Sequence, residues 1–320
     1  MELWKQILKK SITKIDDLSD FLQLTPSQRE VIVRKKNFPL LLPIRLASKI
    51  KKSCLDDPIF KQFVPTQEEL KSDFSFSCDP VQDNIFKKTS TLLHKYASRV
   101  LIVTTQACAM HCRYCFRQNF EYDSPQNFEE EINIINSDTS ISEVILSGGD
   151  PLSLSDDRLH EILNLLNDIP HLKIIRFHTR FPLGIPERIS ENFLKVLQSA
   201  KKQVIFVIHT NHAIELDDDV IAALRKIQSL NIPILCQSVL LKGVNDEIET
   251  LKSLCWKLIE NGIIPYYLHQ LDRVQGAMHF EVSEKTGLNL IEELRKTIPG
   301  YAVFRFVKEI PKELHKSPII

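Results

Sequence analysis

Three cysteines near position 110 have a spacing that is typical of an iron-sulfur centre. Cys108, Cys112 and Cys115 lie in the segment CAMHCRYC, with three and then two residues between them. A cubane [4Fe-4S] cluster normally takes four thiolates, and no fourth cysteine follows in register. Three thiolates leave one iron open, and the amino and carboxylate groups of S-adenosylmethionine (SAM) can chelate it. The spacing therefore predicts a [4Fe-4S] cluster that binds SAM.

A structural zinc site is the alternative for the same cysteines, with His111 or Cys236 as the fourth ligand. Zinc sites usually contain paired cysteines two residues apart, whereas this loop has a three-residue gap followed by a two-residue gap. We therefore favour the cluster. The scattered cysteines are more typical of buried, small apolar residues; they are Cys54, Cys78, Cys236 and Cys255.

A glycine pair in the segment Ser147-Gly148-Gly149-Asp150 is the second candidate for ligand binding, because the chain has only eight glycines in 320 residues. Two glycines let the backbone approach a ligand closely, and their amides and carbonyls can hold a charged amino-acid group. A turn from a strand into a helix would use the same residues. The motif alone leaves both interpretations open.

Six short segments rich in β-branched residues recur along the chain, the first two about 40 residues apart and the others at intervals of about 30, with amphipathic segments such as 156–169 and 217–230 between them. This interval predicts parallel strands joined by crossover helices, one of them opened by Pro186. A further apolar run covers 301–307. The cysteine cluster and the glycine pair each directly follow a predicted strand, which is where ligand sites of parallel α/β folds lie. Periodicity alone does not distinguish an open sheet from an incomplete barrel. The predicted strands are 99–105, 143–147, 173–179, 204–209, 234–240 and 265–271.

Charge and hydropathy exclude several classes of protein. Because 41 Lys and Arg residues balance 41 Asp and Glu residues, the chain has no basic field that would attract nucleic acid. No 18 apolar residues run together, and charges interrupt the first segment, MELWKQILKKSI, so we expect neither a membrane span nor a secretory signal. We expect a cytoplasmic protein that acts on small molecules, in which cysteines serve metal chemistry rather than disulfides.

Six segments together resemble the lysine 2,3-aminomutase family of the radical SAM superfamily. The resemblance runs from about Tyr96 to the C-terminus. It implies an α/β fold: an incomplete parallel (β/α)6 barrel over 96–282, a helical N-terminal region over 1–95, and a C-terminal helix and tail over 283–320. The segments are CRYCFR (112–117), SGGDPL (147–152), HTNHAIE (209–215), QSVLLKGVND (237–246), PYYLHQLDRVQGAMHF (265–280) and GYAV (300–303).

In that superfamily, one electron from the cluster cleaves SAM to a 5′-deoxyadenosyl radical, which removes hydrogen from unactivated carbon. The resemblance implies that Cys108, Cys112 and Cys115 bind the [4Fe-4S] cluster. It also implies an electron donor such as a flavodoxin or a ferredoxin. The SAM contacts that it implies are Ser147, Gly148, Gly149, Asp150 and Gln237.

The family has a second cofactor, pyridoxal 5′-phosphate (PLP), held as a Schiff base on a lysine near the C-terminus. PLP supplies a π-system through which the migrating nitrogen moves. Alignment on GYAV implies that this lysine is Lys316, where composition alone would predict a solvated tail residue. Arg99 matches an arginine at the PLP site. The catabolic members have a glycine run before the lysine, whereas this chain has Lys312-Glu313-Leu314-His315.

Three charged residues match the family's contacts with the substrate lysine. Arg117 corresponds to the arginine that pairs with the α-carboxylate, for which a planar guanidinium is well suited. Asp272 and Glu309 correspond to two carboxylates that hold the ε-ammonium, although the catabolic members have Asp at the position of Glu309. Taken singly, each residue is also typical of a surface ion pair. His209 and His212 stay unassigned, because either fits a satisfied core histidine.

The predicted activity is the radical SAM and PLP-dependent isomerisation of L-lysine to (R)-β-lysine. The segment 265–280 resembles most the short members of the family, which supply β-lysine for the modification of elongation factor P (EF-P) by a lysyl ligase. A role in lysine catabolism or antibiotic synthesis is the alternative within the family. A non-catalytic protein with an iron-sulfur or zinc centre is the alternative outside it. The sequence does not predict the oligomeric state.

Overall fold

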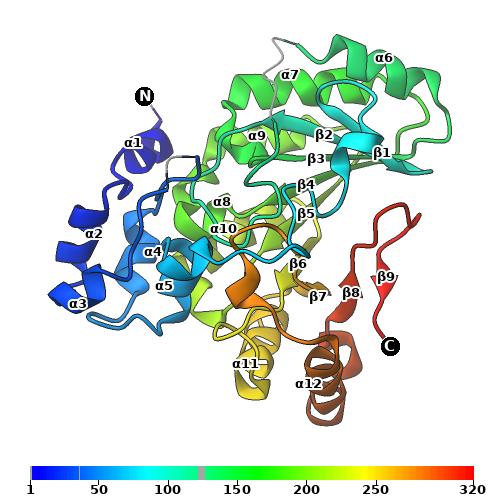
Figure 1. Ribbon diagram of the computed structural model, residues 1–320. Coiled ribbons are helices and arrows are strands. Elements are labelled where there is room, and N and C mark those ends of the chain that lie inside the picture. Colours follow the sequence, from blue (N-terminus) through cyan, green and yellow to red (C-terminus); the bar gives the residue numbers. More distant parts are fainter. Residues whose placement is uncertain (1, 36, 122–126) are drawn as a thin grey trace.

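A nine-stranded sheet forms the centre of the computed structural model, which describes residues 2–35, 37–121 and 127–320 (Figure 1). Each strand pairs with the next one along the chain, so the spatial order equals the sequence order. The strands are β1 (Leu92–Tyr96), β2 (Arg99–Thr105), β3 (Glu143–Gly148), β4 (Ile174–Thr179), β5 (Gln203–His209), β6 (Ile234–Val239), β7 (Ile264–His269), β8 (Arg305–Lys308) and β9 (Ser317–Pro318).

The six predicted strands are confirmed as the parallel strands β2 to β7. The apolar run 301–307 contributes β8, which is parallel to β7. The antiparallel edge strands β1 and β9 were not predicted. The expectation of a helical region up to residue 95 is therefore wrong at its end, because pairing with β2 draws 92–96 into the sheet.

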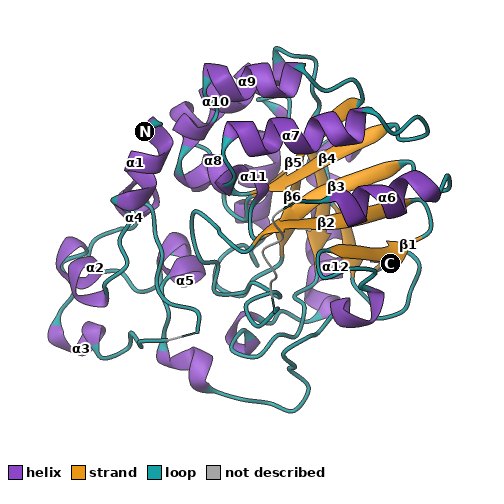
Figure 2. Ribbon diagram, turned by 90° about the horizontal axis from the view of Figure 1, so that it is seen from above, coloured by secondary structure: helices purple, strands orange, loops and turns teal. Residues whose placement is uncertain are grey.

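The strand order identifies the sheet as an incomplete barrel. In a doubly wound sheet the order reverses at a switch point, whereas here it never reverses. The crossover helices α6, α7 and α9 to α12 accordingly lie outside the curved sheet (Figure 2). Within the described ranges β1 and β9 do not pair with each other, so the barrel stays open. The predicted fold class is confirmed, with β8 as one parallel strand more than six. These helices are α6 (Glu129–Ser137), α7 (Asp156–Asn167), α9 (Glu191–Gln198), α10 (Asp218–Gln228), α11 (Ile248–Ile259) and α12 (Glu284–Thr297).

Side-chain caps decide where several crossover helices begin. Ser155, Ser190 and Asp217 each accept a hydrogen bond from a backbone N–H three residues later, at α7, α9 and α10. The prediction that a crossover helix begins at Pro186 is wrong, because Ser190 caps α9 at a later position. Pro186 begins only a short 3-10 helix. The short helices after β2 are η3 (Pro151–Ser153), α8 (Phe181–Gly184), η4 (Pro186–Arg188), η5 (Ala213–Glu215), η6 (Met278–Phe280) and η7 (Gly300–Ala302).

The N-terminal region consists of short helices that pack beside the barrel (Figure 1). One cluster of buried apolar side chains runs from Trp4 to Ile319, so this region, the barrel and the tail share a core. The division at 95 and 282 stays a prediction. The helices of this region are α1 (Leu3–Lys9), α2 (Ile15–Phe21), α3 (Pro26–Arg29), α4 (Ile44–Lys49), α5 (Pro58–Phe63), η1 (Gln67–Leu70) and η2 (Asp83–Phe86).

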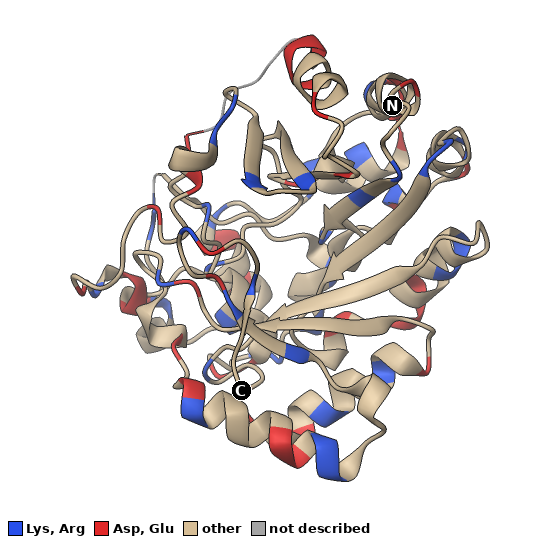
Figure 3. Ribbon diagram, turned by 90° about the vertical axis from the view of Figure 1, so that its right-hand side faces the viewer, with Lys and Arg blue, Asp and Glu red and all other residues tan. Residues whose placement is uncertain are grey.

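Both signs of charge occur together on the outer helices (Figure 3). On α12, for example, the ammonium of Lys296 lies 2.8 Å from the carboxylate of Glu293. Exposed pairs of this kind contribute little to stability. None of the helices in the described ranges is both long and apolar enough to span a membrane. The charged residues predicted for the site lie instead around one cavity.

Candidate active site

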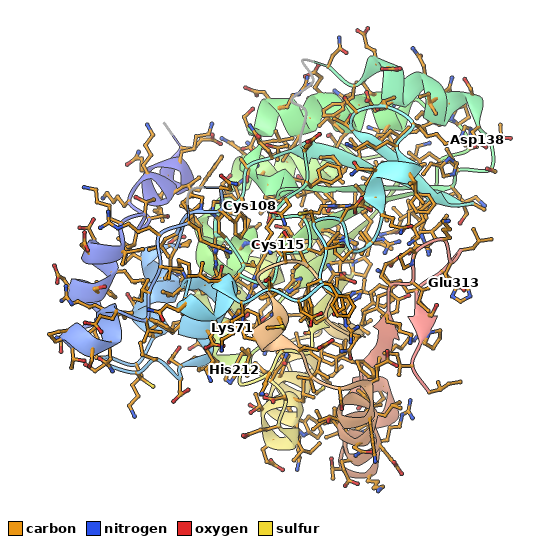
Figure 4. The ribbon with its side chains drawn as sticks, viewed as in Figure 1. Lys71, Cys108, Cys115, Asp138, His212 and Glu313 are labelled. Carbon is orange, nitrogen blue, oxygen red and sulfur yellow. The ribbon has the colours of Figure 1, made fainter. Side chains whose placement is uncertain are left out.

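One cavity at the carboxyl ends of the parallel strands brings together all the residues predicted for the site. Its volume is about 300 Å³. The cysteine loop after β2 forms one wall, and Figure 4 shows Cys108 and Cys115 on this loop in the middle of the molecule. The predicted residues that line the cavity are Arg99, Cys108, Cys112, Cys115, Arg117, Ser147, Gly148, Gly149, Asp150, Gln237, Asp272, Glu309 and Lys316.

The N-terminal region holds the cysteine loop in place. The backbone N–H of His111 donates to the carbonyl of Leu41 at 3.1 Å, and that of Arg113 donates to the carbonyl of Gln62 at 2.8 Å. The Arg113 guanidinium also forms two bonds, of 2.8 and 2.7 Å, with the carboxylate of Glu69, and both side chains are buried. Removing one partner of such a pair costs about 3 to 5 kcal/mol. The loop is therefore fixed from outside the barrel.

The glycine pair lets the turn after β3 lie directly on the cysteine loop. Gly148 has a φ of +115°, and a Cβ at Gly149 would lie 2.4 Å from the carbonyl oxygen of Ala107. The N–H of Gly149 donates to the carbonyl of Thr105 at 2.6 Å. Both positions thus require glycine whether or not a ligand is bound. Contact with SAM stays a prediction for this turn and for Ser147.

The carboxylate of Asp150 ties this turn to the end of β4. It accepts hydrogen bonds from the backbone N–H of Arg180 at 2.7 Å and of Phe181 at 3.0 Å, and from the hydroxyl of Thr179 at 2.8 Å. Burial raises the pKa of Asp150 to about 6, even though these bonds lower it. Its carboxylate oxygens are occupied by the protein. A contact between Asp150 and SAM is therefore a prediction for its backbone.

Arg117 faces the cavity and is paired with the N-terminal region. Its Nε and Nη2 both lie 2.8 Å from Oδ2 of Asp83 in η2, and its guanidinium packs on the ring of Phe116. A carboxylate thus occupies the position in which a substrate carboxylate is predicted. The guanidinium is held in the orientation that such a bond needs.

Asp272 is a carboxylate in the cavity wall without a counter-ion in contact. No hydrogen bond or ion pair reaches its side chain within the described part of the chain. Burial raises the pKa of Asp272 to about 7, and the charge of Lys316 offsets this only in part. A half-buried carboxylate of this kind would be stabilised by a cation that binds in the cavity.

Glu309 has the opposite environment, because two lysines already bind its carboxylate. The ammonium of Lys316 lies 2.6 Å from Oε2, Lys95 contacts Oε1, and the hydroxyl of Tyr96 donates at 3.0 Å. Although burial acts against it, the two lysines hold the pKa of Glu309 below its ordinary value. Lys316 and Glu309, both predicted for the site, are thus brought into direct contact across the end of β8.

Three histidines from β4, β5 and β7 also line the cavity; they are His178, His209 and His269. Burial lowers the pKa of each well below its ordinary value, so all three are neutral at pH 7. His209 pairs with the hydroxyl of Tyr114 at 3.0 Å. His212, in contrast, lies outside the cavity lining and caps η5 through its ring nitrogen. Of the two histidines left unassigned, only His209 belongs to the site.

Comparison with known proteins identifies the family. A protein of Haemophilus influenzae (strain ATCC 51907 / DSM 11121 / KW20 / Rd) named L-lysine 2,3-aminomutase is 38% identical over 319 residues, which cover 98% of this chain and 94% of the relative. A protein of Escherichia coli (strain K12) with the same name is 36% identical, with 99% and 94% covered. Residues 102–255 match the Radical SAM superfamily. The chain belongs to the L-lysine 2,3-aminomutase family.

Members of the L-lysine 2,3-aminomutase family are isomerases, and the chain is therefore assigned to this class of enzyme. A longer member, the L-lysine 2,3-aminomutase of Clostridium subterminale, is 31% identical and is covered over 77% of its length. Among solved structures, a radical SAM methyltransferase from Sphaerobacter thermophilus has a TM-score of 0.50 at 17% identity, with 68% of each chain covered. This likeness supports the fold alone.

The cysteines of this aminomutase fit a shared cationic centre. Burial and, after it, the neighbouring Cys112 raise the pKa of Cys115 to about 11. The pKa of Cys108 is also raised, first by burial and then by Asp150 and the other two thiols. Iron would supply the positive charge that these crowded thiols lack. No three ligand side chains in the described ranges can share one metal ion, but each thiolate of a cubane binds its own iron.

The other end of the cavity fits PLP in its donor set. The Lys316 amine lies in the cavity, and Arg99 packs at 4.4 Å on the ring of Tyr96. Lys95 adds a second cation beside Glu309. An amine, cations for a phosphate and an aromatic ring are groups that PLP binding uses. The assignment of Lys316 and Arg99 to PLP stays a prediction.

Several residues of the site were not predicted from the sequence. They contact predicted residues from far away along the chain: Asp83 contacts Arg117, and Lys95 contacts Glu309 across 214 positions. Arg180 lies beside Cys112. None stands in a motif with a recognisable spacing. Only the charge of each residue marked it, and charges are common on any surface.

The unpaired Asp272 makes a prediction about stability. Because folding raises its pKa from 3.8 to about 7, the folded chain binds this proton more tightly, and the group destabilises the fold increasingly as pH rises between those values. Asp272→Asn should therefore stabilise cofactor-free protein at pH 8 by about 1 to 4 kcal/mol, and should have little effect near pH 4. Urea unfolding at both pH values measures this. The control is Glu281→Gln, which removes a carboxylate that pairs with the exposed Arg273. A loss of stability in Asp272→Asn at pH 8 would refute the raised pKa.

Proposed function

We propose that the protein is a lysine 2,3-aminomutase that converts L-lysine to (R)-β-lysine with a [4Fe-4S] cluster, SAM and PLP. The observation that carries this is the charge arrangement in one cavity: a buried guanidinium, Arg117, and two carboxylates, Asp272 and Glu309, of which Asp272 has no cation in contact. Lysine carries a carboxylate and an ammonium at opposite ends. The names of the relatives supply the same substrate.

Different residues bind the two ends of the substrate lysine. Arg117 holds the α-carboxylate, which replaces Asp83 as its partner. Asp272 and Glu309 hold the ε-ammonium, and Lys316 leaves Glu309 when it binds PLP. With both ends fixed, Cβ is held in one place, and position rather than acid-base chemistry is what the protein supplies. When bound, SAM on the cluster supplies the hydrogen-abstracting radical and PLP supplies the π-system for nitrogen migration.

The three histidines of the cavity add no positive charge to it at pH 7. His178, His209 and His269 cannot act as cations at pH 7, because burial depresses the pKa of each. They therefore do not compete with the ε-ammonium for the two carboxylates.

The test is anaerobic turnover of L-lysine with SAM, PLP and dithionite, followed by chiral chromatography. We expect (R)-β-lysine. L-norleucine, which has the same chain without the ammonium, is the matched substrate control and should not react. Absence of β-lysine from protein that holds iron and PLP, or equal turnover of norleucine, would refute the function. Protein that holds only zinc would favour the non-catalytic alternative.

Replacing Asp272 with Asn should lower kcat/KM for L-lysine. The substitution leaves Glu309 alone against the ε-ammonium, and loss of one charge-assisted contact costs about 1.5 to 3 kcal/mol, roughly ten- to a hundredfold. Iron and PLP content should stay unchanged. Steady-state kinetics measure the effect, with Glu281→Gln as a control that removes a carboxylate outside the cavity. Wild-type turnover by Asp272→Asn would eliminate the ammonium site.

We further propose that the β-lysine is delivered to a lysyl ligase that modifies EF-P. The chain spans 94% of the Haemophilus and Escherichia relatives but only 77% of the Clostridium relative, which supports the short form. The electron comes from a low-potential donor such as a flavodoxin or a ferredoxin. When the reaction mixture is supplied to EF-P and its ligase with ATP, EF-P should gain the mass of one β-lysyl group, which is β-lysine less the water lost on amide formation. An unmodified EF-P beside free β-lysine would favour catabolism or antibiotic synthesis.

A further inference from the structure

A buried arginine lies against one of the three cysteines. Arg180 follows β4, and its Nη1 donates to Sγ of Cys112 at 3.1 Å. The guanidinium also contacts the hydroxyl of Tyr114, and it packs 4.6 Å from the centre of the Phe63 ring. Only 7% of its side chain is exposed. Its charge therefore acts on Cys112 through protein rather than through water.

A buried carboxylate balances this charge on the side away from the cysteine. Oε2 of Glu215 accepts from Nη2 of Arg180 at 2.7 Å, and Glu215 is fully buried. Its other oxygen accepts from the backbone N–H of Asn211 at 3.0 Å. Gln62 completes the network, since its Oε1 accepts from Arg180 at 2.7 Å. These bonds fix the cation next to Cys112 and the anion beyond it.

Such an arrangement acts on electron transfer, because charges and hydrogen bonds at cluster sulfurs set the reduction potential. One electron from a low-potential donor changes an oxidised [4Fe-4S] cluster to its reduced form, and no bond forms or breaks. The reduced form carries one more negative charge. A cation at a thiolate stabilises it, and an anion destabilises it, with larger effects in a buried environment.

We propose that Arg180 raises the reduction potential of the cluster at Cys112 and that Glu215 limits this rise. The proposal rests on the proposed function only in that Cys108, Cys112 and Cys115 hold a [4Fe-4S] cluster. Arg180 acts through Cys112, so its role differs from that of a group that binds lysine. The N-terminal region takes part through Gln62, which lies on α5.

The experiment is an anaerobic redox titration of the cluster-loaded protein with dithionite, followed by electron paramagnetic resonance, without SAM, PLP or lysine. At the midpoint potential of the wild type, Arg180→Gln should lower the ratio of reduced to oxidised cluster by roughly threefold or more, and Glu215→Gln should raise it by a similar factor. Arg180→Lys keeps a charge and should fall between Arg180→Gln and the wild type. Arg188→Gln is the control, because Arg188 is buried but binds Asp156 and the carbonyl of Leu152.

Opposite shifts in Arg180→Gln and Glu215→Gln support the proposal; no shift, or shifts of the same sign, overturns it. If the Arg180 variants lose iron, Glu215→Gln decides alone, since it leaves every group that touches Cys112 in place. Lysine turnover distinguishes failure of the redox proposal from failure of the proposed function. An unchanged potential in protein that makes β-lysine refutes only this proposal, and a shifted potential in protein that makes none refutes only the function.

Discussion

Replacing Cys115 with alanine should yield protein without iron and without aminomutase activity. The wild type should hold about four irons per chain after anaerobic reconstitution. One iron is already left open for SAM, so Cys108 and Cys112 alone would leave half of a cubane without protein ligands. The same loss is expected for Cys108→Ala and Cys112→Ala. Iron and sulfide analysis, together with absorbance at about 410 nm, measures the cluster content.

Cys255→Ala is the matched control for this series. Cys255 is fully buried on α11 and does not line the cavity. Its replacement should keep the iron and cost stability only, since it removes one small buried side chain. Stoichiometric zinc without iron in the wild type, or a full cluster in any of the three cavity variants, would contradict the cluster assignment.

Loss of Lys316 should abolish PLP attachment and reduce lysine turnover to background. The amine lies in the cavity, where it contacts Glu309 at 2.6 Å, and its replacement by alanine removes the predicted attachment point. Borohydride reduction of PLP-loaded wild type should fix the cofactor on Lys316, and peptide mass spectrometry identifies the modified residue. In Lys316→Ala the pyridoxyl group should be missing, while the iron content stays at the wild-type level.

Lys95 makes this a sharp test, because it contacts the same carboxylate. A pyridoxyl group on Lys95 would show that the alignment of the tail is wrong. Lys308→Ala serves as the control, since Lys308 is on the outer side of β8 and pairs with Glu284 at 2.9 Å. It should keep PLP and turnover. Full turnover by Lys316→Ala would refute the assignment of Lys316 as the PLP lysine.

The barrel could be predicted because its signal is local and repeated. The strands β2 to β5 are largely buried runs rich in β-branched residues, such as Val204 to Ile208 in β5. The strand order then places the cysteine loop after β2 beside the glycine turn after β3, since neighbouring parallel strands end at the same edge. The edge strands gave no such signal. β1 is short and ends in polar residues, and only its pairing with β2 defines it.

The residues that hold the site residues in position could not be predicted, because they are single residues that lie far apart in the sequence and come into contact only in the fold. Gln62 and Glu69 hold the cysteine loop from the N-terminal region. Arg180 directly follows β4, whereas Glu215 lies on η5 after β5. Hydrogen-bond partners of this kind have no periodicity and depend on packing alone. The resemblance to the aminomutase family predicts the ligands but not the residues that orient them.

The tail before Lys316 shows how a glycine-free segment can make a turn. Lys312 has a φ of +70°, a left-handed conformation for which glycine is preferred. The catabolic members are expected to have glycines in this segment. Here a lysine takes the strained position, and Glu309 and Lys316 still meet on the two sides of the turn. The missing glycines therefore do not remove Lys316 from the cavity.

The most direct measurement follows hydrogen from the substrate. The proposed function requires Cβ of lysine, held between Arg117 and the pair Asp272 and Glu309, to lie next to SAM on the cysteine loop. Anaerobic incubation with L-lysine that carries deuterium on Cβ should yield deuterium in the 5′-deoxyadenosine recovered from SAM, and (R)-β-lysine as product. Unlabelled 5′-deoxyadenosine from protein that holds the cluster, SAM and PLP would contradict the placement of lysine in this cavity.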